Sequence, residues 1–258
     1  MKNFKLLNII TGWAVFLVAA IVYLLTIEPT ASFWDCGEFI STAYKLEVGH
    51  PPGAPFFMLL GRFFTLFSGG PENAAISVNI LSAMASAFTI LFLFWTITHL
   101  AKKIINKTSK TLYKANVIAI LGSGSVGALA YTFSDTFWFS AVEAEVYATS
   151  SLITAVVFWA ILKWENEADQ KYSNRWLILI AYLVGLSLGV HLLNLLAIPA
   201  IVFVYYFRKY NTTVRGVIGA AVLSIVILLS IMYLILTGFV SLASKFELFL
   251  VNGFGLPF

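Results

Sequence analysis

AAISVNILSAMASAFTILFLFWTITHL, residues 74–100, contains no Asp, Glu, Lys or Arg. An α-helix needs about 20 apolar residues to cross roughly 30 Å of hydrocarbon, so this stretch predicts a membrane-spanning helix. Comparable runs lie at about 8–27, 115–133, 146–162 and 216–238. The chain is 60% hydrophobic and 11% charged, with a mean hydropathy of +0.91, which leaves too few polar groups to cover a soluble globule. The sequence therefore predicts an all-α integral membrane protein.

The apolar run at 176–207 is long for one crossing and short for two, and the basic residues decide between them. One helix would place Arg208 and Lys209 outside, whereas two short helices turning near Gly189-Val190-His191 return them to the cytoplasm. We therefore predict about seven transmembrane helices, with the N-terminus cytoplasmic and the C-terminus and the first loop external. All Lys and Arg residues then lie inside except Lys45, Arg62 and Lys245, and all Asp and Glu residues lie outside except Glu165, Glu167 and Asp169.

Several familiar patterns have a simpler interpretation in an apolar chain. The single Cys36 excludes an internal disulfide, and the three histidines lack metal-ligand spacing, so a bound metal would need carboxylates. The net charge of +4 follows membrane topology, and we infer no nucleic-acid partner. GSGSVG, residues 122–127, matches a dinucleotide-binding pattern but lies within a membrane-length run, where small residues favour close helix packing.

The first loop, residues 28–73, is long and only partly hydrophilic. Its stretch 54–67, APFFMLLGRFFTLF, is apolar except for Arg62 and predicts an interfacial helix on the outer leaflet. The prolines at positions 51, 52 and 55 discourage an earlier helix start. Gly49 and Gly53 loosen the backbone around His50, so the loop can fold back over the membrane surface.

Asp35 and Glu38 are the first candidate catalytic residues. They are three apart, so on a short helix they share one face. Trp34 and Phe39 flank them and favour a position against the bilayer, where a carboxyl tends to have the raised pKa of a general base. Two solvated interface acids are the alternative.

A second group of acids lies where the fourth span begins, at Asp135, Glu143 and Glu145. Glu145 is the deepest. Acids at a helix start gain from the helix dipole, which would explain them without a function. The functional interpretation is a polar cavity that Glu145 shares with Asp35, Glu38 and His191, because an ionisable group entering a span is costly and the turn near His191 would need polar surroundings.

Three stretches carry a resemblance to a known family: EPTASFWDCGEFISTAYKLEVGHPPGAPFF, AEVYATSSL and GLSLGVHLLNLLAIP. Together they resemble the bacterial and animal membrane proteins related to transmembrane protein 260, which are protein O-mannosyltransferases with the GT-C glycosyltransferase fold. The resemblance implies a GT-C-type bundle whose first external loop carries the essential acid. It places Asp35 at the catalytic position with Glu38 beside it, and either can be the base. His50, Glu145 and His191 match family positions.

The resemblance also implies a reaction. A sugar, expected to be mannose, would pass from a polyprenyl-phosphate donor to Ser or Thr hydroxyls of exported proteins, with inversion at the anomeric carbon. Arg62, His50 and His191 are the external groups that could bind the donor phosphate, and Glu145 is a further substrate-binding candidate. No cofactor is required, although the acids do not exclude a divalent metal. The expected partners are the lipid-linked donor, an acceptor protein and membrane lipids, and the expected location is the bacterial inner membrane.

Two other functional classes remain open from the sequence. A transporter or lipid flippase would favour charges in mid-span and a repeated half, and a structural scaffold gives no reason for the acid-rich loop. We expect residues 1–258 to form a single transmembrane domain that is the N-terminal part of a longer protein.

Overall fold

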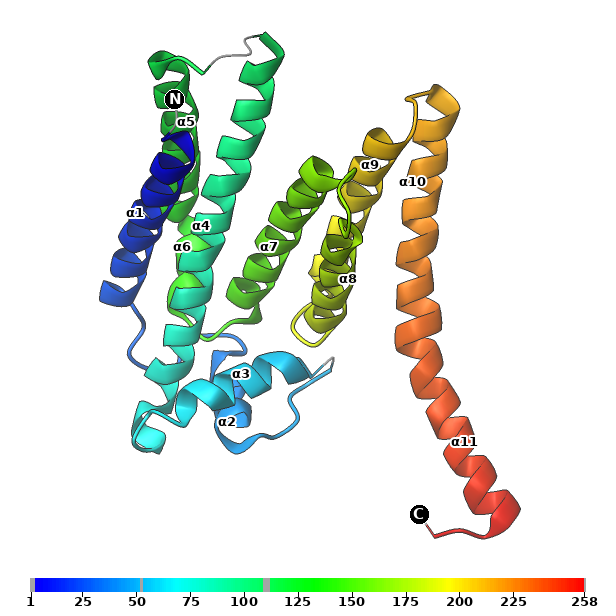
Figure 1. Cartoon of the computed structure of the whole chain (residues 1–258). Helices are drawn as coiled ribbons and strands as arrows, with labels where there is room; N and C mark the ends of the chain where they lie inside the picture. Colours follow the sequence, from blue (N-terminus) through cyan, green and yellow to red (C-terminus); the bar gives the residue numbers. More distant parts are fainter. Residues whose placement is uncertain (1–2, 52, 109–111, 258) are drawn as a thin grey trace. The chain divides into compact units, whose positions relative to one another are not determined.

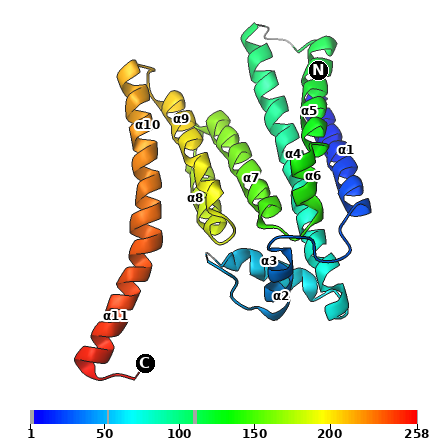
Figure 2. The same ribbon diagram turned by 180° about the vertical axis from the view of Figure 1, so that it is seen from behind.

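The fold is an arrangement of helices, shown from opposite sides in Figures 1 and 2. A computed structural model describes residues 3–51, 53–108 and 112–257, and this part of the chain contains helices but no strand. The helices are α1 (Phe4–Leu25), α2 (Cys36–Lys45), α3 (Pro55–Thr65), α4 (Ala74–Thr108), α5 (Lys114–Thr132), α6 (Asp135–Val142), α7 (Val146–Glu167), α8 (Asn174–Leu188), α9 (Ala197–Lys209), α10 (Val214–Leu229) and α11 (Gly238–Phe254). The chain groups into two compact units, Met1–Asn194 and Leu195–Phe258, and each is described by itself.

Six helical segments among the described residues are long and apolar enough to cross a membrane, which confirms the prediction of an all-α membrane protein. They are Phe4–Leu25, Pro71–Lys107, Lys114–Thr132, Val146–Glu167, Leu192–Lys209 and Val214–Phe254. The seventh predicted span corresponds to the shorter apolar helix α8, and its crossing of the membrane stays a prediction. Whether residues 1–258 form one domain, as the sequence suggests, stays a prediction.

The run at 176–207 is interrupted where the sequence predicts a turn. Helix α8 ends at Leu188, and a short 3₁₀ segment, Leu192–Leu196, precedes α9. Gly189 is required here because a Cβ at this position would lie 2.9 Å from Cβ of Phe56. Its carbonyl oxygen accepts hydrogen bonds from the backbone N–H groups of Phe56 (2.7 Å) and Phe57 (3.2 Å). The turn thereby satisfies the first free N–H groups of α3.

The last predicted span, 216–238, ends too early. The helical segment continues from α10 through a π-helical stretch, Ser230–Thr237, into α11. It stops at Gly255, whose φ of 65° is the left-handed conformation that ends many helices. Residues 214–255 contain no proline. The apolar composition alone therefore does not show where the helix ends. A second unforeseen element is α6, a short helix between the predicted spans at 115–133 and 146–162.

Close packing around α4 forms the core of the first unit. Ala83, Ala87 and Phe94 of α4 are fully buried against residues of α1, α5 and α6. A Cβ added to Gly124 of α5 would lie 2.5 Å from Cγ2 of Thr98 and 2.9 Å from the ring of Phe94. This supports the interpretation of GSGSVG as a packing motif.

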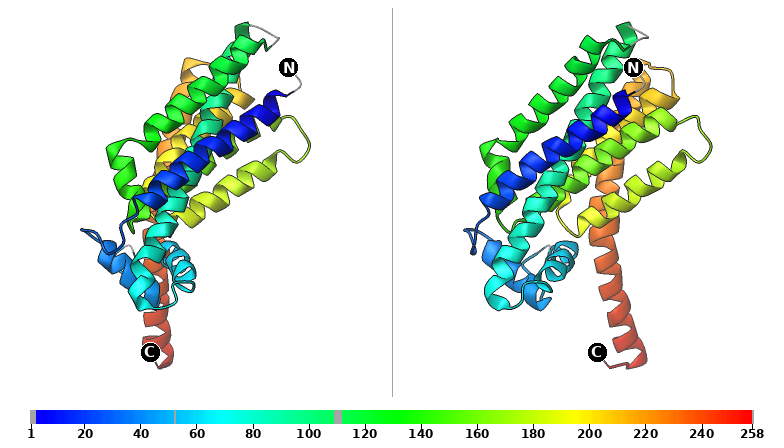
Figure 3. Two further views of the ribbon diagram at one scale, coloured as in Figure 1. Left: turned by 90° about the vertical axis from the view of Figure 1, so that its left-hand side faces the viewer. Right: turned by 60° about the vertical axis from the view of Figure 1, so that its left-hand side comes forward.

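The first loop is folded against the bundle rather than extended. Asn79 of α4 donates hydrogen bonds from its side-chain nitrogen to the carbonyl oxygens of Glu28 (2.6 Å) and Thr30 (3.1 Å). Beyond this anchor, α2 and α3 pack on each other and on the first turns of α4, as Figure 3 shows. The predicted helix at 54–67 is confirmed as α3, with Pro55 at its start. Pro52 lies outside the described residues, and the contact of α3 with lipid stays a prediction.

The two glycines of α5 allow a matched test of this packing. Gly124→Ala should destabilise the protein by about 1–3 kcal/mol, because the added methyl overlaps α4. Gly122→Ala should be neutral or slightly stabilising, because nothing lies within 4 Å of the added Cβ and alanine favours a helix. Thermal unfolding of both variants in detergent measures the difference. Equal losses of stability would contradict the packing role of Gly124.

Candidate active site

The two acids of the first loop lie at the start of α2. Asp35 is the N-cap residue and Glu38 lies in the first helical turn. Trp34 before them adopts a φ of 60°, so the chain turns sharply into the helix. The Asp35 side chain is 55% exposed and that of Glu38 is 37% exposed. Both carboxylates can therefore reach a molecule that binds outside the bundle.

His50 connects these two carboxylates. Its backbone N–H donates to Oε1 of Glu38 at 2.5 Å, and its ring Nδ1 lies 3.0 Å from Oε2 of the same residue. The other ring nitrogen, Nε2, lies 3.9 Å from Oδ2 of Asp35. Gly49 makes this approach possible, because a Cβ there would lie 3.0 Å from Glu38 Oε1. The hydrogen bonds between His50 and Glu38 thus close the intervening residues, 39–49, into a loop.

The charges of this group favour an imidazolium beside carboxylates. The hydrogen bond and charge of Glu38 raise the pKa of His50, and the charges of Asp35 and Glu145 add to this effect. In turn, hydrogen bonds from the His50 backbone and then from its ring lower the pKa of Glu38. The pair thus binds a proton on the imidazole while the Glu38 carboxylate stays ionised.

A second group of titratable residues is buried next to the first. Cys36, Glu143 and Glu145 are only 1%, 3% and 7% exposed. The thiol of Cys36 donates to Oε1 of Glu145 at 3.5 Å. Burial is the main cause that raises the pKa of Glu145 to about 7, with smaller contributions from the charges of Glu143 and Asp35. Burial also raises the pKa of the Cys36 thiol and of Glu143, so the thiol remains a donor at neutral pH.

His191 lies against the first turn of α7. Its ring centroid is 5.2 Å from that of Tyr147, two residues after Glu145. Nδ1 of His191 accepts a hydrogen bond from the backbone N–H of Leu193 at 3.1 Å, so the ring proton of a neutral imidazole is on Nε2. Burial lowers the pKa of His191. This histidine therefore offers a neutral donor, in contrast to His50.

Arg62 is held apart from the acids. Its Nη1 donates to the carbonyl oxygen of Tyr44 at 2.5 Å, and its guanidinium lies 5.4 Å from the centre of the Tyr44 ring. Tyr44 lies near the end of α2, about 9 Å along the helix axis from Glu38. Within the described part of the chain, no hydrogen bond or ion pair joins Arg62 to the acids. Its role at a donor phosphate stays a prediction.

Among the residues that the structure describes, two sets of three have the chemistry to hold a metal ion. In each set, Asp35 with Glu38 and His50 and Cys36 with Glu143 and Glu145, the potential ligand atoms lie within 4.8 Å of one another. The first set is accessible and combines carboxylate oxygens with an imidazole, whereas the second is buried. Hard cations such as Mg²⁺ or Ca²⁺ prefer oxygen ligands, which favours the accessible set.

Two residues of this region could not be assigned from the sequence. Cys36 appears there only as an unpaired cysteine, yet its thiol bonds to Glu145, which is far from it in the chain. Tyr147 occurs in the sequence as an aromatic residue of an apolar run, yet its ring contacts that of His191. Long-range contacts of this kind leave no local pattern, although a cysteine between two acids is a weak signal.

Comparison with known proteins identifies the family to which the chain belongs. The family model described as the protein O-mannosyl-transferase TMEM260 N-terminal domain matches residues 35–214. The chain belongs to this family. The TMEM260 family match begins at Asp35 and includes all six candidate site residues.

Two curated relatives support the assignment to the TMEM260 family. The mouse protein O-mannosyl-transferase TMEM260 is 30% identical over 179 residues, which is 68% of this chain. The Dictyostelium discoideum protein O-mannosyl-transferase tmem260 is 25% identical over 201 residues, which is 74% of this chain. In both cases the match covers 22% of the relative's length. No solved structure matches the chain.

The buried Glu145 predicts a specific pH dependence of stability. Its raised pKa means that the folded protein keeps a proton that the unfolded chain has lost, so stability falls as the pH rises from about 5 through about 7. Glu145→Gln should remove about 1–3 kcal/mol of this pH-dependent loss. Thermal unfolding at pH 5 and pH 8 measures it, with the exposed Glu72→Gln as the control. An unchanged difference between the two pH values in Glu145→Gln would contradict the assignment.

Proposed function

We propose that the protein containing this chain is a membrane glycosyltransferase that transfers mannose from a polyprenyl-phosphate donor to Ser or Thr hydroxyls of exported proteins. The observation that carries this proposal is the group of Asp35, Glu38 and His50 beside the buried Glu145 at one end of the bundle. Membership of the TMEM260 family supports it. The chain matches only 22% of its relatives' length, so the activity is proposed for the complete protein.

Asp35 is the better candidate for the general base. Both carboxylate oxygens of Glu38 already accept hydrogen bonds from His50. Asp35 is more exposed, and its Oδ2 is 3.9 Å from the nearest His50 nitrogen, so it can bind the acceptor hydroxyl. Glu38 then acts as a positioning residue that holds His50. This division of roles is the reason to prefer Asp35 within the DCGE motif.

The reaction is a single displacement. The hydroxyl oxygen of the acceptor attacks the anomeric carbon as its proton passes to the carboxylate of Asp35. The bond from that carbon to the phosphate oxygen breaks, and its electron pair leaves with polyprenyl phosphate. Attack and departure on opposite sides of the carbon invert its configuration. The transfer of the proton to a positioned base contributes about 10² to 10⁴ in rate.

Histidine donors can stabilise the departing phosphate. The His50 imidazolium carries positive charge, and the neutral His191 offers Nε2–H. Charge develops on the phosphate oxygens in the transition state, where such donors act most strongly. Arg62 could join them only by leaving its contacts with Tyr44. A divalent cation at the Asp35, Glu38 and His50 set could serve the same purpose.

The neighbouring helix α3 is suited to a lipid-linked donor. Its residues Leu59 and Phe63 are exposed, as is Phe67 just beyond its end, although all three are large and apolar. Apolar side chains exposed on a short helix beside a bundle of spans favour contact with acyl or prenyl chains. A polyprenyl chain lying along α3 would bring its phosphate toward the acids of α2, which pack against α3.

Substitution of Asp35 tests the proposal directly. In the full-length protein, Asp35→Asn should reduce transfer of mannose from polyprenyl-phosphate mannose to an acceptor peptide by about 10² to 10⁴. Glu47→Gln is the matched control, because Glu47 is an exposed acid of the same loop that pairs with Lys45. Glu38→Gln should reduce transfer less and lower the pKa of His50 in a histidine NMR titration.

Full transfer by Asp35→Asn would remove this residue from the mechanism. If the wild-type protein moves the lipid-linked sugar across a vesicle membrane without transferring it, the enzyme proposal fails and the transporter alternative holds.

A further inference from the structure

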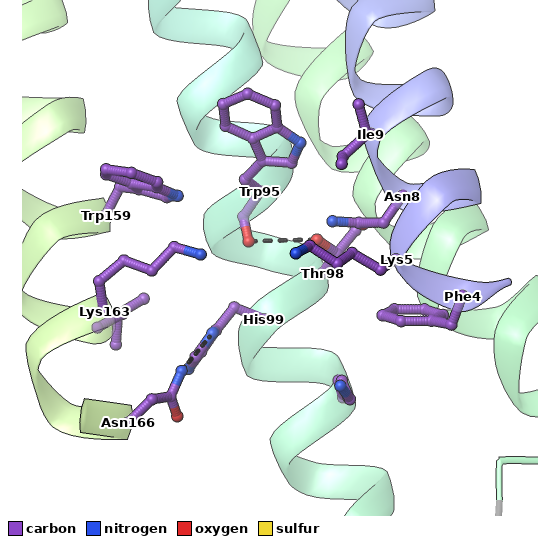
Figure 4. A pocket seen from close by; sticks show the side chains of 12 residues that line it. Phe4, Lys5, Asn8, Ile9, Trp95, Thr98, His99, Trp159, Lys163 and Asn166 are labelled. Carbon is purple, nitrogen blue, oxygen red and sulfur yellow. Dashed lines mark hydrogen bonds between the residues drawn. The ribbon is translucent and has the colours of Figure 1, made fainter. Parts of the chain in front are cut away.

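The first unit contains a cavity at the end opposite the acids. It has a volume of about 460 Å³ and lies among the first turns of α1, the last part of α4 and the last turns of α7. Figure 4 shows it from close by. Glu145 directly precedes α7, whereas Lys163 of the cavity lies near its end, so about 27 Å of helix separates the two. The cavity is therefore distinct from the candidate active site.

The cavity is lined by cations and by no acid. Lys5, Lys102 and Lys163 come from three different helices. In Figure 4 the amino groups of Lys5 and Lys163 point from opposite walls toward its centre. Among the described residues, none of the three forms an ion pair with a carboxylate. The nearby Glu165 is paired with Lys103 outside the lining, and Glu167, which the charge of Lys163 also affects, is bound by Arg175 and Trp176.

Two lysines are fixed by aromatic rings of the wall. Nζ of Lys102 lies 5.0 Å from the centre of the Phe4 ring, and Nζ of Lys163 lies 5.1 Å from that of Trp159. Cation–π contacts of this kind hold the amino groups at the cavity without neutralising their charge. The lysines are thus partly ordered before a ligand binds, which lowers the entropy cost of binding.

A polar group between the lysines has unused hydrogen-bonding capacity. The side-chain Oδ1 of Asn8 is buried and has no hydrogen-bond partner in the described part of the protein. A buried polar atom without a partner costs free energy, and a ligand hydroxyl could satisfy it. His99 and Asn166 lie across the cavity and contact each other at 3.5 Å. An anionic group that also carries hydroxyls would match this lining.

The remaining wall is apolar and aromatic. Ile9, Trp95 and Leu162 line the cavity together with Phe4 and Trp159. Indole rings are typical of the depth at which lipid headgroups meet the hydrocarbon. The cavity thus combines three cations with an apolar wall at the end of three membrane-length helices, which is the arrangement expected for an amphiphile rather than for a free anion.

We propose that this cavity binds the phosphate headgroup of an anionic membrane phospholipid. The ammonium groups of Lys5, Lys102 and Lys163 contact the phosphate, the Asn8 side chain contacts a headgroup hydroxyl, and an acyl chain lies along the aromatic wall. The cavity faces the cytoplasmic leaflet in the predicted topology, where anionic lipids attract basic groups. Such a site would anchor the bundle in one leaflet and hold α1, α4 and α7 together at the end away from the acids.

Lipid binding by the whole chain in detergent tests the proposal. Titration with dioleoyl phosphatidylglycerol should raise the thermal stability and give a saturable Kd, whereas dioleoyl phosphatidylcholine should not. Lys102→Gln with Lys163→Gln should weaken phosphatidylglycerol binding by about 10- to 30-fold, since each basic group contributes about tenfold or less. Lys107→Gln with Lys114→Gln is the matched control, because these lysines share that end of the bundle but do not line the cavity.

The outcomes separate the possible ligands. Equal stabilisation by phosphatidylcholine, or an equal loss of affinity in the control variant, would overturn the proposal. Stabilisation by inorganic phosphate at matched concentration would assign the cavity to a soluble phosphate and overturn the lipid. Tryptophan quenching by phosphatidylglycerol with brominated acyl chains gives a second readout, and Trp159→Phe should reduce it if the chain lies on the aromatic wall. Unchanged quenching in Trp159→Phe would contradict the proposed position of the chain.

Discussion

A charged side chain in hydrocarbon is costly, and this constraint sorts the polar chemistry of the protein toward the helix ends. The acids at Asp35, Glu38 and Glu145 lie in the first loop and at the start of α7. The lysines of the cavity lie at the start of α1 and near the ends of α4 and α7. The first unit therefore has an acidic end and a basic end, separated by apolar helix. Each end suits a different ligand chemistry.

The acidic end depends on contacts between segments that are far apart in the sequence. The Gly189 carbonyl caps the start of α3, Asn79 anchors the beginning of the first loop, and His50 closes the loop on Glu38. These contacts place an exposed carboxylate over a buried one. Their environments shift the two pKa values in opposite directions. Hydrogen bonds from His50 lower the pKa of Glu38, whereas burial raises that of Glu145. Acids with such different proton affinities are common at catalytic sites.

The sequence predicts the helices well because their signals are local. Apolar length identifies the spans, Pro55 marks the start of α3, and the basic residues after α9 point correctly to a break near Gly189. Two helical segments have no such local signal. The segment after residue 238 stays helical because nothing stops it before Gly255, and α6 lies where a loop is predicted.

The candidate site is only partly predictable for a related reason. Residue type and spacing suggest that Asp35 and Glu38 act together, and the cost of an ionisable group at a span suggests Glu145. The hydrogen bonds from His50 to Glu38 and from Cys36 to Glu145 depend on tertiary packing. For Arg62, residue type alone is misleading. Its charge suggests a phosphate ligand, whereas the packing of α2 on α3 places it against Tyr44.

The account requires the acidic end to face away from the cytoplasm, and cysteine accessibility measures this most directly. Cys36 is buried, so it would be replaced by alanine and a cysteine placed at Val48, which is 90% exposed in the first loop. We expect a membrane-impermeant maleimide to label Val48→Cys in intact cells, and to label Lys107→Cys in the same background only after permeabilisation. Labelling of Lys107→Cys but not Val48→Cys in intact cells would contradict the account.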